Sequence, residues 1–104
     1  MNKIAFLNDG LRRTFARGRI VMTAAVAALP EEMLAKVLDR VRRFDEFTSD
    51  NDPYGEHDFG SFAFQGLPEK VWFKVDLYEE LGVKGTDGEP VVSRVLTIML
   101  AEEY

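Results

Sequence analysis

The sequence predicts an α+β fold, with two helices packed on one face of an antiparallel sheet of about four strands. Two stretches in the first half have apolar residues at helical spacing, and the second half has segments of strand character joined by short connectors. The chain has 104 residues, which is enough for one domain only. We therefore expect a single domain over residues 1–104, in the order helix, strand, helix, strand, strand, strand.

The first two elements are predicted within residues 3–23. An amphipathic helix is expected over residues 3–16, with Gly18 as its C-terminal cap. Its apolar residues at helical spacing are Ile4, Leu7, Leu11 and Phe15. The β-branched residues of 19–23 favour a strand, whereas the alanine-rich run 24–29 fits either a strand end or a buried turn.

The second helix has the clearest signal. Pro30 is typical of the first turn of a helix, and the acidic Glu31 and Glu32 favour the positive end of the helix dipole. The apolar stripe of this helix consists of Leu34, Val37, Leu38, Val41, Phe44 and Phe47. Because the opposite face is charged, we expect the helix to pack on the core by one side.

Three strands are predicted after the polar loop 48–58. Phe62 and Phe64 mark one face of the first, and residues 71–78 alternate as a second, so the short connector indicates a hairpin. The last strand, within 91–100, is apolar on both faces beyond Arg94. Such a strand belongs in the middle of a sheet or under a partner, and homodimerisation through the sheet face is therefore a hypothesis.

Composition excludes several classes of function. The chain has no cysteine, which rules out disulfide scaffolds, thiolate catalysis and cysteine-ligated metal sites. The longest nearly apolar run, residues 20–29, is about half the length of a membrane-spanning helix, and the N-terminal apolar run is too short for a signal peptide. We expect a cytoplasmic protein without membrane contact, and no cofactor is predicted.

Charge is distributed unevenly along the chain. Residues 1–43 carry nine basic and four acidic side chains, whereas residues 44–104 carry four basic and fourteen acidic ones. The first half contains a basic cluster, formed by Arg12, Arg13, Arg17 and Arg19. These side chains could contact phosphates, which makes a nucleic-acid accessory factor one alternative, although the net charge of −5 disfavours general nucleic-acid binding.

Residues 50–60, here called the acidic loop, concentrate four carboxylates with the only histidine of the chain. The candidate binding residues are Asp50, Asn51, Asp52, Tyr54, Glu56, His57, Asp58 and, from the predicted second strand of the hairpin, Asp76. Carboxylates and imidazole are metal ligands, which makes Asp52, His57 and Asp58 candidate ligands. A histidine beside carboxylates is also typical of acid–base catalysis, with Glu56, His57 and Asp58 as candidates.

Besides these functional interpretations, the residues of the acidic loop also fit a purely structural role. Asp, Asn, Pro and Gly are turn formers, and their side chains bond the local backbone. Asp50, Asp52 and Gly55 match the start of an EF-hand calcium loop, but Ser61 replaces the required glutamate. The chain also lacks every complete catalytic motif we considered, including GxSxG, the Walker motif and HExxH.

Two strings resemble a small bacterial family, the domain-of-unknown-function family numbered 3768. They are DNDPYGEHDFG at residues 50–60 and RVLTIMLAEEY at residues 94–104. The stretch Trp72-Phe73-Lys74-Val75-Asp76-Leu77-Tyr78 is similar to the Trp-Lys-Ile-Asp-Tyr-Tyr pattern of the family, with Phe73 additional. The residues that match signature positions are Asn51, Asp52, Pro53, Gly55, Glu56, His57, Asp58, Phe59, Gly60, Asp76, Glu102, Glu103 and Tyr104. The resemblance implies no activity.

From these observations we expect a small cytoplasmic binding or accessory protein that uses the acidic loop as an interaction surface for a protein partner. One alternative is a metal-dependent hydrolase-like or nuclease-like enzyme centred on His57. The other is the nucleic-acid accessory factor that would use the basic cluster from Arg12 to Arg19.

Overall fold

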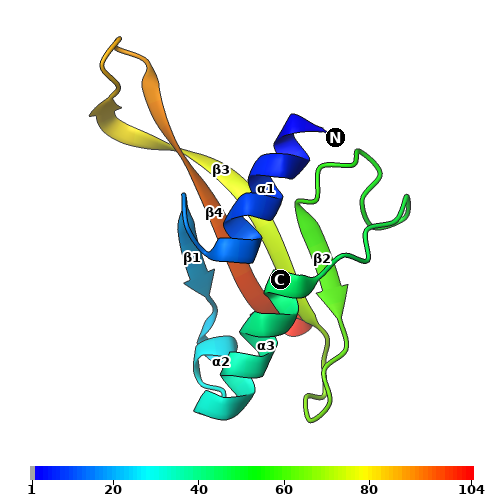
Figure 1. The fold of residues 1–104 in the computed structure, drawn as a ribbon. Helices are drawn as coiled ribbons and strands as arrows, with labels where there is room; N and C mark the ends of the chain where they lie inside the picture. The colour runs from blue at the N-terminus through cyan, green and yellow to red at the C-terminus, as the bar shows by residue number, and fades with distance from the viewer. Residues whose placement is uncertain (1) are drawn as a thin grey trace.

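The computed structural model describes residues 2–104, with the side chains of residues 80–84 and 90 left aside (Figure 1). Three α-helices, four strands and a terminal 3₁₀ helix are found in this part of the chain. In order they are α1 (Lys3–Thr14), β1 (Arg19–Met22), α2 (Ala24–Ala27), α3 (Glu31–Arg43), β2 (Phe59–Phe62), β3 (Val71–Lys84), β4 (Pro90–Leu100) and η1 (Ala101–Glu103). The α+β class is confirmed.

The sheet is mixed, and the expectation of a purely antiparallel sheet was wrong. Its strand order is β1-β4-β3-β2, with β1 parallel to β4 and the other two pairs antiparallel. The hairpin of β2 and β3 places Gly60 opposite Phe73, and β3 then pairs with β4 along most of its length. The direction of β1 depends on which edge of the sheet the first strand joins, and no local residue pattern encodes that choice.

The position of β4 agrees with its composition. A strand with apolar residues on both faces is expected in the middle of a sheet or under a partner, and β4 lies in the middle, between β1 and β3. Leu96 and Ile98 face the helices and are fully buried, while Val95 and Met99 on the opposite face are nearly so. The core therefore lies between the sheet and the helices, which cover one face of it (Figure 1).

Several helix and strand boundaries differ from the predicted ones. The first helix ends at Thr14, because Phe15 takes a left-handed conformation with φ of 55° and acts as the C-cap. Gly18 has another role: a Cβ there would lie 2.5 Å from the carbonyl oxygen of Arg94. The alanine-rich run forms the short α2, so three helices replace the expected two. The first strand of the hairpin is Phe59–Phe62, earlier than expected.

The second face of the sheet is not covered by helices. Trp72 packs edge-on against Phe59 and Tyr104, with ring centroids 5.3 and 5.0 Å apart. Beyond this cluster, Val21 and Tyr78 are exposed, and the β3–β4 hairpin projects away from the helices (Figure 1). Homodimerisation through this face stays a prediction. Within residues 2–104, each helix is too short or too polar to cross a membrane.

Candidate functional site

The connection between α3 and β2 contains the acidic loop, and local hydrogen bonds hold its first turn. The side-chain oxygen of Asn51 accepts from the Thr48 N–H at 2.8 Å, and its amide nitrogen donates to the Glu46 carbonyl at 2.8 Å. The Asp52 N–H donates to the Thr48 carbonyl at 2.8 Å. The two bonds of the Asn51 side chain are the side chain-to-backbone bonds by which Asx residues build turns, and the Asp52 bond joins backbone to backbone. Asn51, a candidate binding residue, is thus used by the loop itself.

Asp52 closes the second turn of the acidic loop. Its side chain is almost fully buried and accepts hydrogen bonds from the backbone N–H groups of Glu56 and His57, at 3.0 and 3.2 Å. These donors satisfy both carboxylate oxygens, since the His57 N–H also lies 3.2 Å from the second one. A buried carboxylate needs such partners. Asp52 therefore holds the backbone of the acidic loop in its second turn.

His57 lies between two carboxylates, with one quarter of its side chain exposed. Its Nδ1 is 3.0 Å from both carboxylate oxygens of Asp9, and its Nε2 is 3.7 Å from an oxygen of Asp52. The ring is stacked on Phe47, with centroids 4.0 Å apart and planes inclined by 4°. The backbone of His57 is left-handed, with φ of 55°, a conformation that histidine adopts more readily than most residues.

Asp9 connects this histidine to a buried arginine. The Arg12 side chain is completely buried, and its Nη2 donates to Asp9 at 2.8 Å. Its Nη1 donates to the carbonyls of Val41 and Arg42, both at 3.0 Å. These carbonyls belong to the last turn of α3, where carbonyl groups lack the usual partner four residues on, although Val41 also accepts from the C-cap N–H of Phe44 at 3.4 Å. Arg12 therefore joins α1, the end of α3 and, through Asp9, the acidic loop.

The electrostatics of Arg12 follow from its surroundings. Burial lowers the pKa of its guanidinium, and the hydrogen bond with Asp9 acts in the opposite direction. The guanidinium also lies over two aromatic rings, 5.3 Å from the centroid of Phe47 and 5.7 Å from that of Phe73. An arginine stays charged at any ordinary pH, so Asp9 and the helix carbonyls provide the compensation that a buried cation requires.

Asn8 extends the network to the sheet. Its side chain is 2% exposed; the amide nitrogen donates to the Glu56 carbonyl at 2.9 Å, and the oxygen accepts from Nη1 of Arg94. Two consecutive residues of α1, Asn8 and Asp9, thus hold Glu56 and His57. We call Asn8, Asp9, Arg12, Asp52 and His57 the buried polar network.

The candidate catalytic and metal residues are not brought together around a cavity. Glu56 is held through its backbone, and the Asp58 carbonyl accepts from the Val75 N–H at 2.8 Å. Among the side chains that the structure describes, no group of three His, Asp or Glu residues could hold a metal ion. Nε2 of His57 faces Asp52 instead of an open substrate position. The partly buried His57 ring thus supports the acidic loop through its contacts with Asp9, Asp52 and Phe47.

Asp76 lies away from the buried polar network. On β3 it alternates with Phe73 and Val75, which face the core, and so belongs to the uncovered face of the sheet. Its carboxylate is 3.2 Å from Nζ of Lys74, and this hydrogen bond raises the pKa of Lys74. Of the other candidate binding residues, Asp50 and Tyr54 remain exposed, and the Tyr54 side chain has 80% of its surface free.

The basic cluster is divided by the fold. Arg12 is buried and its two terminal nitrogens are bound to Asp9 and to carbonyls of α3, so it cannot contact a phosphate as one alternative required. Arg13 and Arg17 are exposed near the end of α1, and Arg19 lies on β1, beside the uncovered face of the sheet. The four arginines therefore do not form one surface.

The C-terminal signature stretch also holds the fold together. Glu103 accepts from the Thr23 hydroxyl and from the backbone N–H groups of Ala25 and Leu100. These hydrogen bonds, that of Thr23 first, lower the pKa of Glu103. Nearby, burial and then a hydrogen bond with Glu102 raise the pKa of Glu69. Glu103 thus ties the C-terminal end of β4 to the start of α2.

Sequence reasoning missed three residues of this site: Asn8, Asp9 and Arg94. Asp9 and Arg12 stand three residues apart on a helix, a spacing at which opposite charges meet, and this signal was available. The contacts of Asn8 and Asp9 with the acidic loop span 48 residues of sequence, so no local pattern indicates them.

A family model described as "Protein of unknown function (DUF3768)" matches residues 22–103. The chain belongs to this family. The matched segment of the DUF3768 family includes the acidic loop and Glu103, whereas Asn8, Asp9 and Arg12 precede it. No curated protein and no solved structure matches the chain.

Proposed function

We propose that this DUF3768 protein is a small cytoplasmic binding protein of bacteria whose interaction surface is the rim of the acidic loop. The rim consists of the exposed residues Asp50, Pro53, Tyr54 and Gly55. The proposal rests on a contrast between the inner and the outer side chains of the acidic loop. Its inner side chains are bound by the buried polar network, while Tyr54 at its outer side is 80% exposed.

A loop whose backbone is fixed by its own inner side chains is suited to binding. Asn51, Asp52 and His57 fix its backbone before any partner arrives, so little conformational entropy is lost on association. Tyrosine is a frequent anchor of protein interfaces because it offers a large rigid ring and a polar hydroxyl. Tyr54 therefore fits a pocket on a protein partner.

Charge indicates the nature of that partner. The exposed acidic residues Glu46 and Asp50 lie on either side of the first turn, where Asn51 bonds the Glu46 carbonyl. Complementary charge favours encounter with basic surfaces and disfavours acidic ones. The expected partner is a protein with a basic rim around an apolar pocket.

The test compares captured partners of four forms of the protein: wild type, Tyr54→Ala, Asp50→Asn and Tyr78→Ala. Tyr78 is a matched control, because it is an exposed tyrosine on β3. Quantitative mass spectrometry of a pull-down from the source cells, with crosslinking from a photoreactive phenylalanine at position 54, identifies the partner. We expect a partner that is lost with Tyr54→Ala, weakened with Asp50→Asn and retained with Tyr78→Ala.

Two results would contradict the proposal. One is equal capture of every partner by wild type and Tyr54→Ala. The other is a partner lost only with Tyr78→Ala, which would move the interaction surface to the uncovered face of the sheet. Because Tyr54 makes no contact that the fold depends on, thermal unfolding of Tyr54→Ala should match wild type, which excludes misfolding as the cause.

A further inference from the structure

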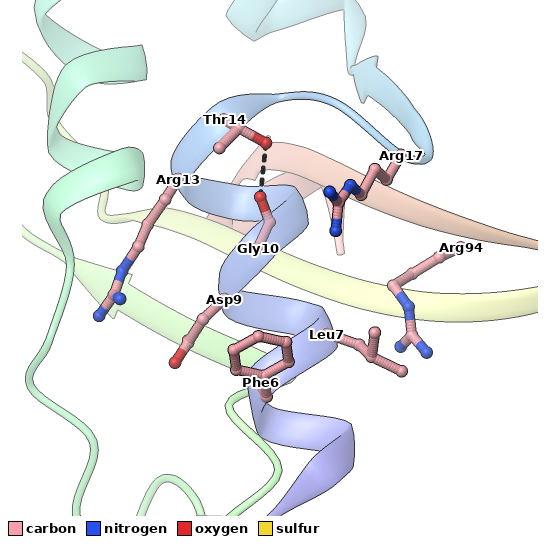
Figure 2. Close-up of a pocket in the computed structure, with 8 residues that line it drawn as sticks. All are labelled: Phe6, Leu7, Asp9, Gly10, Arg13, Thr14, Arg17 and Arg94. Atoms are coloured by element: carbon pink, nitrogen blue, oxygen red, sulfur yellow. Dashed lines mark hydrogen bonds between the residues drawn. The ribbon is translucent and has the colours of Figure 1, made fainter.

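A hollow of about 330 Å³ lies on the outer face of α1, next to β4 (Figure 2). It is lined by Phe6, Leu7, Asp9, Gly10, Arg13, Thr14, Arg17 and Arg94. A volume of this size is at the lower end of the range for small-molecule sites. The rim of the acidic loop does not contribute to it, so the hollow is independent of the surface proposed above.

The hollow carries positive charge without a counter-ion. Among the described residues, Arg13, Arg17 and Arg94 make no ion pair with a carboxylate. The one acidic residue in the lining, Asp9, is already bound to Arg12 and His57. Arg17 and Arg94 lie on one side of α1, whereas Arg13 extends to the other side, so the first two are the cations that an anion in the hollow can meet together (Figure 2).

One of these arginines is held in place by a hydrogen bond, and another has an unusual backbone conformation. Arg94 lines the hollow and donates from Nη1 to the buried Asn8, a bond that occupies one of its three nitrogen atoms (Figure 2). Arg17 has a left-handed backbone with φ of 68°, a conformation that side-chain-bearing residues adopt rarely. An observed backbone outlier of this kind is often found at functional positions. Both side chains lie on the same side of α1 in Figure 2.

Gly10 is the second unusual feature. It lies within α1, where glycine is unfavourable compared with alanine, yet a Cβ at this position would meet nothing within 4 Å. Packing of the protein itself thus does not require glycine here. The absence of a side chain leaves the helix backbone open at the floor of the hollow, where a ligand can approach closely.

The apolar part of the lining stands one turn before Gly10. Phe6 and Leu7 are 62% and 39% exposed, both large side chains on the same helix as the arginines. Apolar surface beside cations is the pattern of sites that take molecules with an apolar body and an anionic end.

We propose that the hollow is a binding site for a small amphipathic anion, an apolar group bearing a carboxylate or a phosphate. The anionic end lies between Arg17 and Arg94, with Arg13 adding long-range attraction. The apolar body lies across Gly10 and against Phe6 and Leu7. Three cations on a hollow of this size suit one or two negative charges better than a long polyanion.

The test uses four probes in ¹H–¹⁵N NMR titrations of the full chain: 3-phenylpropionate, phenyl phosphate, inorganic phosphate and benzyl alcohol. We expect at least one of the two aromatic anions to shift residues 6–17 and Arg94 saturably, with a Kd on the order of 1 mM. If 3-phenylpropionate binds more tightly than phenyl phosphate, the ligand is a carboxylate. If phenyl phosphate binds more tightly, the ligand is a phosphate. Inorganic phosphate and benzyl alcohol, which each carry only half of the required chemistry, should bind at least about tenfold more weakly.

Variants locate the site. Arg17→Gln and Arg94→Gln should each weaken binding of the aromatic anion by about tenfold. Gly10→Leu fills the hollow and should abolish binding while raising the Tm, because leucine is a better helix former and its Cβ meets nothing within 4 Å. A gain in stability with a loss of binding cannot come from misfolding. Arg43→Gln is the matched control, since Arg43 is an exposed arginine on α3 outside the hollow, and it should leave binding unchanged.

The proposal is overturned if neither aromatic anion gives saturable shifts up to about 20 mM. It is equally overturned if the shifts map elsewhere, if Gly10→Leu binds as well as wild type, or if inorganic phosphate binds as tightly as phenyl phosphate. The last result would indicate a simple anion site with no role for Phe6 and Leu7.

Discussion

The acidic loop and the hollow on α1 contrast in how their polar groups are used. In the loop, Asn51, Asp52 and His57 are all bound to other parts of the chain. In the hollow, Arg13 and Arg17 have no carboxylate partner among the described residues, and Gly10 meets no side chain. A dense cluster of chemically active residue types in a sequence therefore need not be where binding groups are free.

One helix serves both regions. Asn8, Asp9 and Arg12 are buried and hold the loop and α3, whereas Phe6, Gly10 and Arg13 line the hollow. This division follows the helical repeat, because residues three or four apart share one face of a helix. The comparison predicts large losses of stability on the inner face of α1 and small changes, or gains, on its outer face.

Arg12→Met should have the largest effect. It leaves Asp9 buried without its counter-ion and removes the hydrogen bonds that two carbonyls of α3 accept from Arg12, so we expect a loss of about 3–5 kcal/mol in the free energy of unfolding. Urea denaturation measures it. The matched control is Arg13→Met, which removes the same charge from the exposed neighbour and should change stability by less than about 0.5 kcal/mol. Similar losses of stability in Arg12→Met and Arg13→Met would contradict the division of α1 into an inner and an outer face.

Gly60→Ala should have the next largest effect on stability. A Cβ at this position would lie 2.4 and 2.5 Å from ring atoms of Phe73 and 2.8 Å from Phe44, so the core must shift. We expect a loss of about 1–3 kcal/mol from this overpacking. The neighbouring Ser61→Ala is the control in the same urea experiment. A neutral Gly60→Ala would mean that the glycine at the end of the acidic loop does not have a packing role.

Glu103→Gln extends the comparison to the second signature stretch and should depend on pH. Because the hydrogen bond from Thr23 lowers its pKa in the folded state, Glu103 stabilises the fold above the ordinary value of 4.5, and this contribution is lost as pH falls through the lower folded value. Thermal unfolding should therefore separate wild type from Glu103→Gln at neutral pH and bring them together in acid. A pH-independent difference in Tm would contradict the assigned role.

Gly10→Ala should have the smallest effect and the opposite sign. Alanine meets nothing within 4 Å and is the better helix former, so we expect a gain of about 0.5–1 kcal/mol in the free energy of unfolding. Urea denaturation beside wild type measures this gain as well. A loss of stability would show that the backbone at Gly10 is needed by the protein itself and would weaken the case for the hollow.

The sequence allowed much of the local structure to be predicted. Apolar spacing indicated α3 and the core-facing positions Val37 and Val41, and the two-sided apolar character of β4 indicated its central place. Turn-forming residues indicated that 50–60 is a loop. The site was harder to predict, because its residue types are compatible with a structural turn, a binding surface and a metal or catalytic centre. Asp52 can ligate a metal, activate a histidine or cap a turn, and only its partners tell these apart.

Family membership, the α+β class and the central strand were thus determined by sequence alone, since each depends on residue identity or on short-range periodicity. Tertiary structure decided the parallel pairing of β1 with β4, the burial of Arg12 and the contact of His57 with Asp9. These depend on contacts between segments up to 76 positions apart in the paired strands, Arg19 with Val95 for example. Side-chain chemistry sets which partners are suitable, but only the path of the whole chain sets which of them meet.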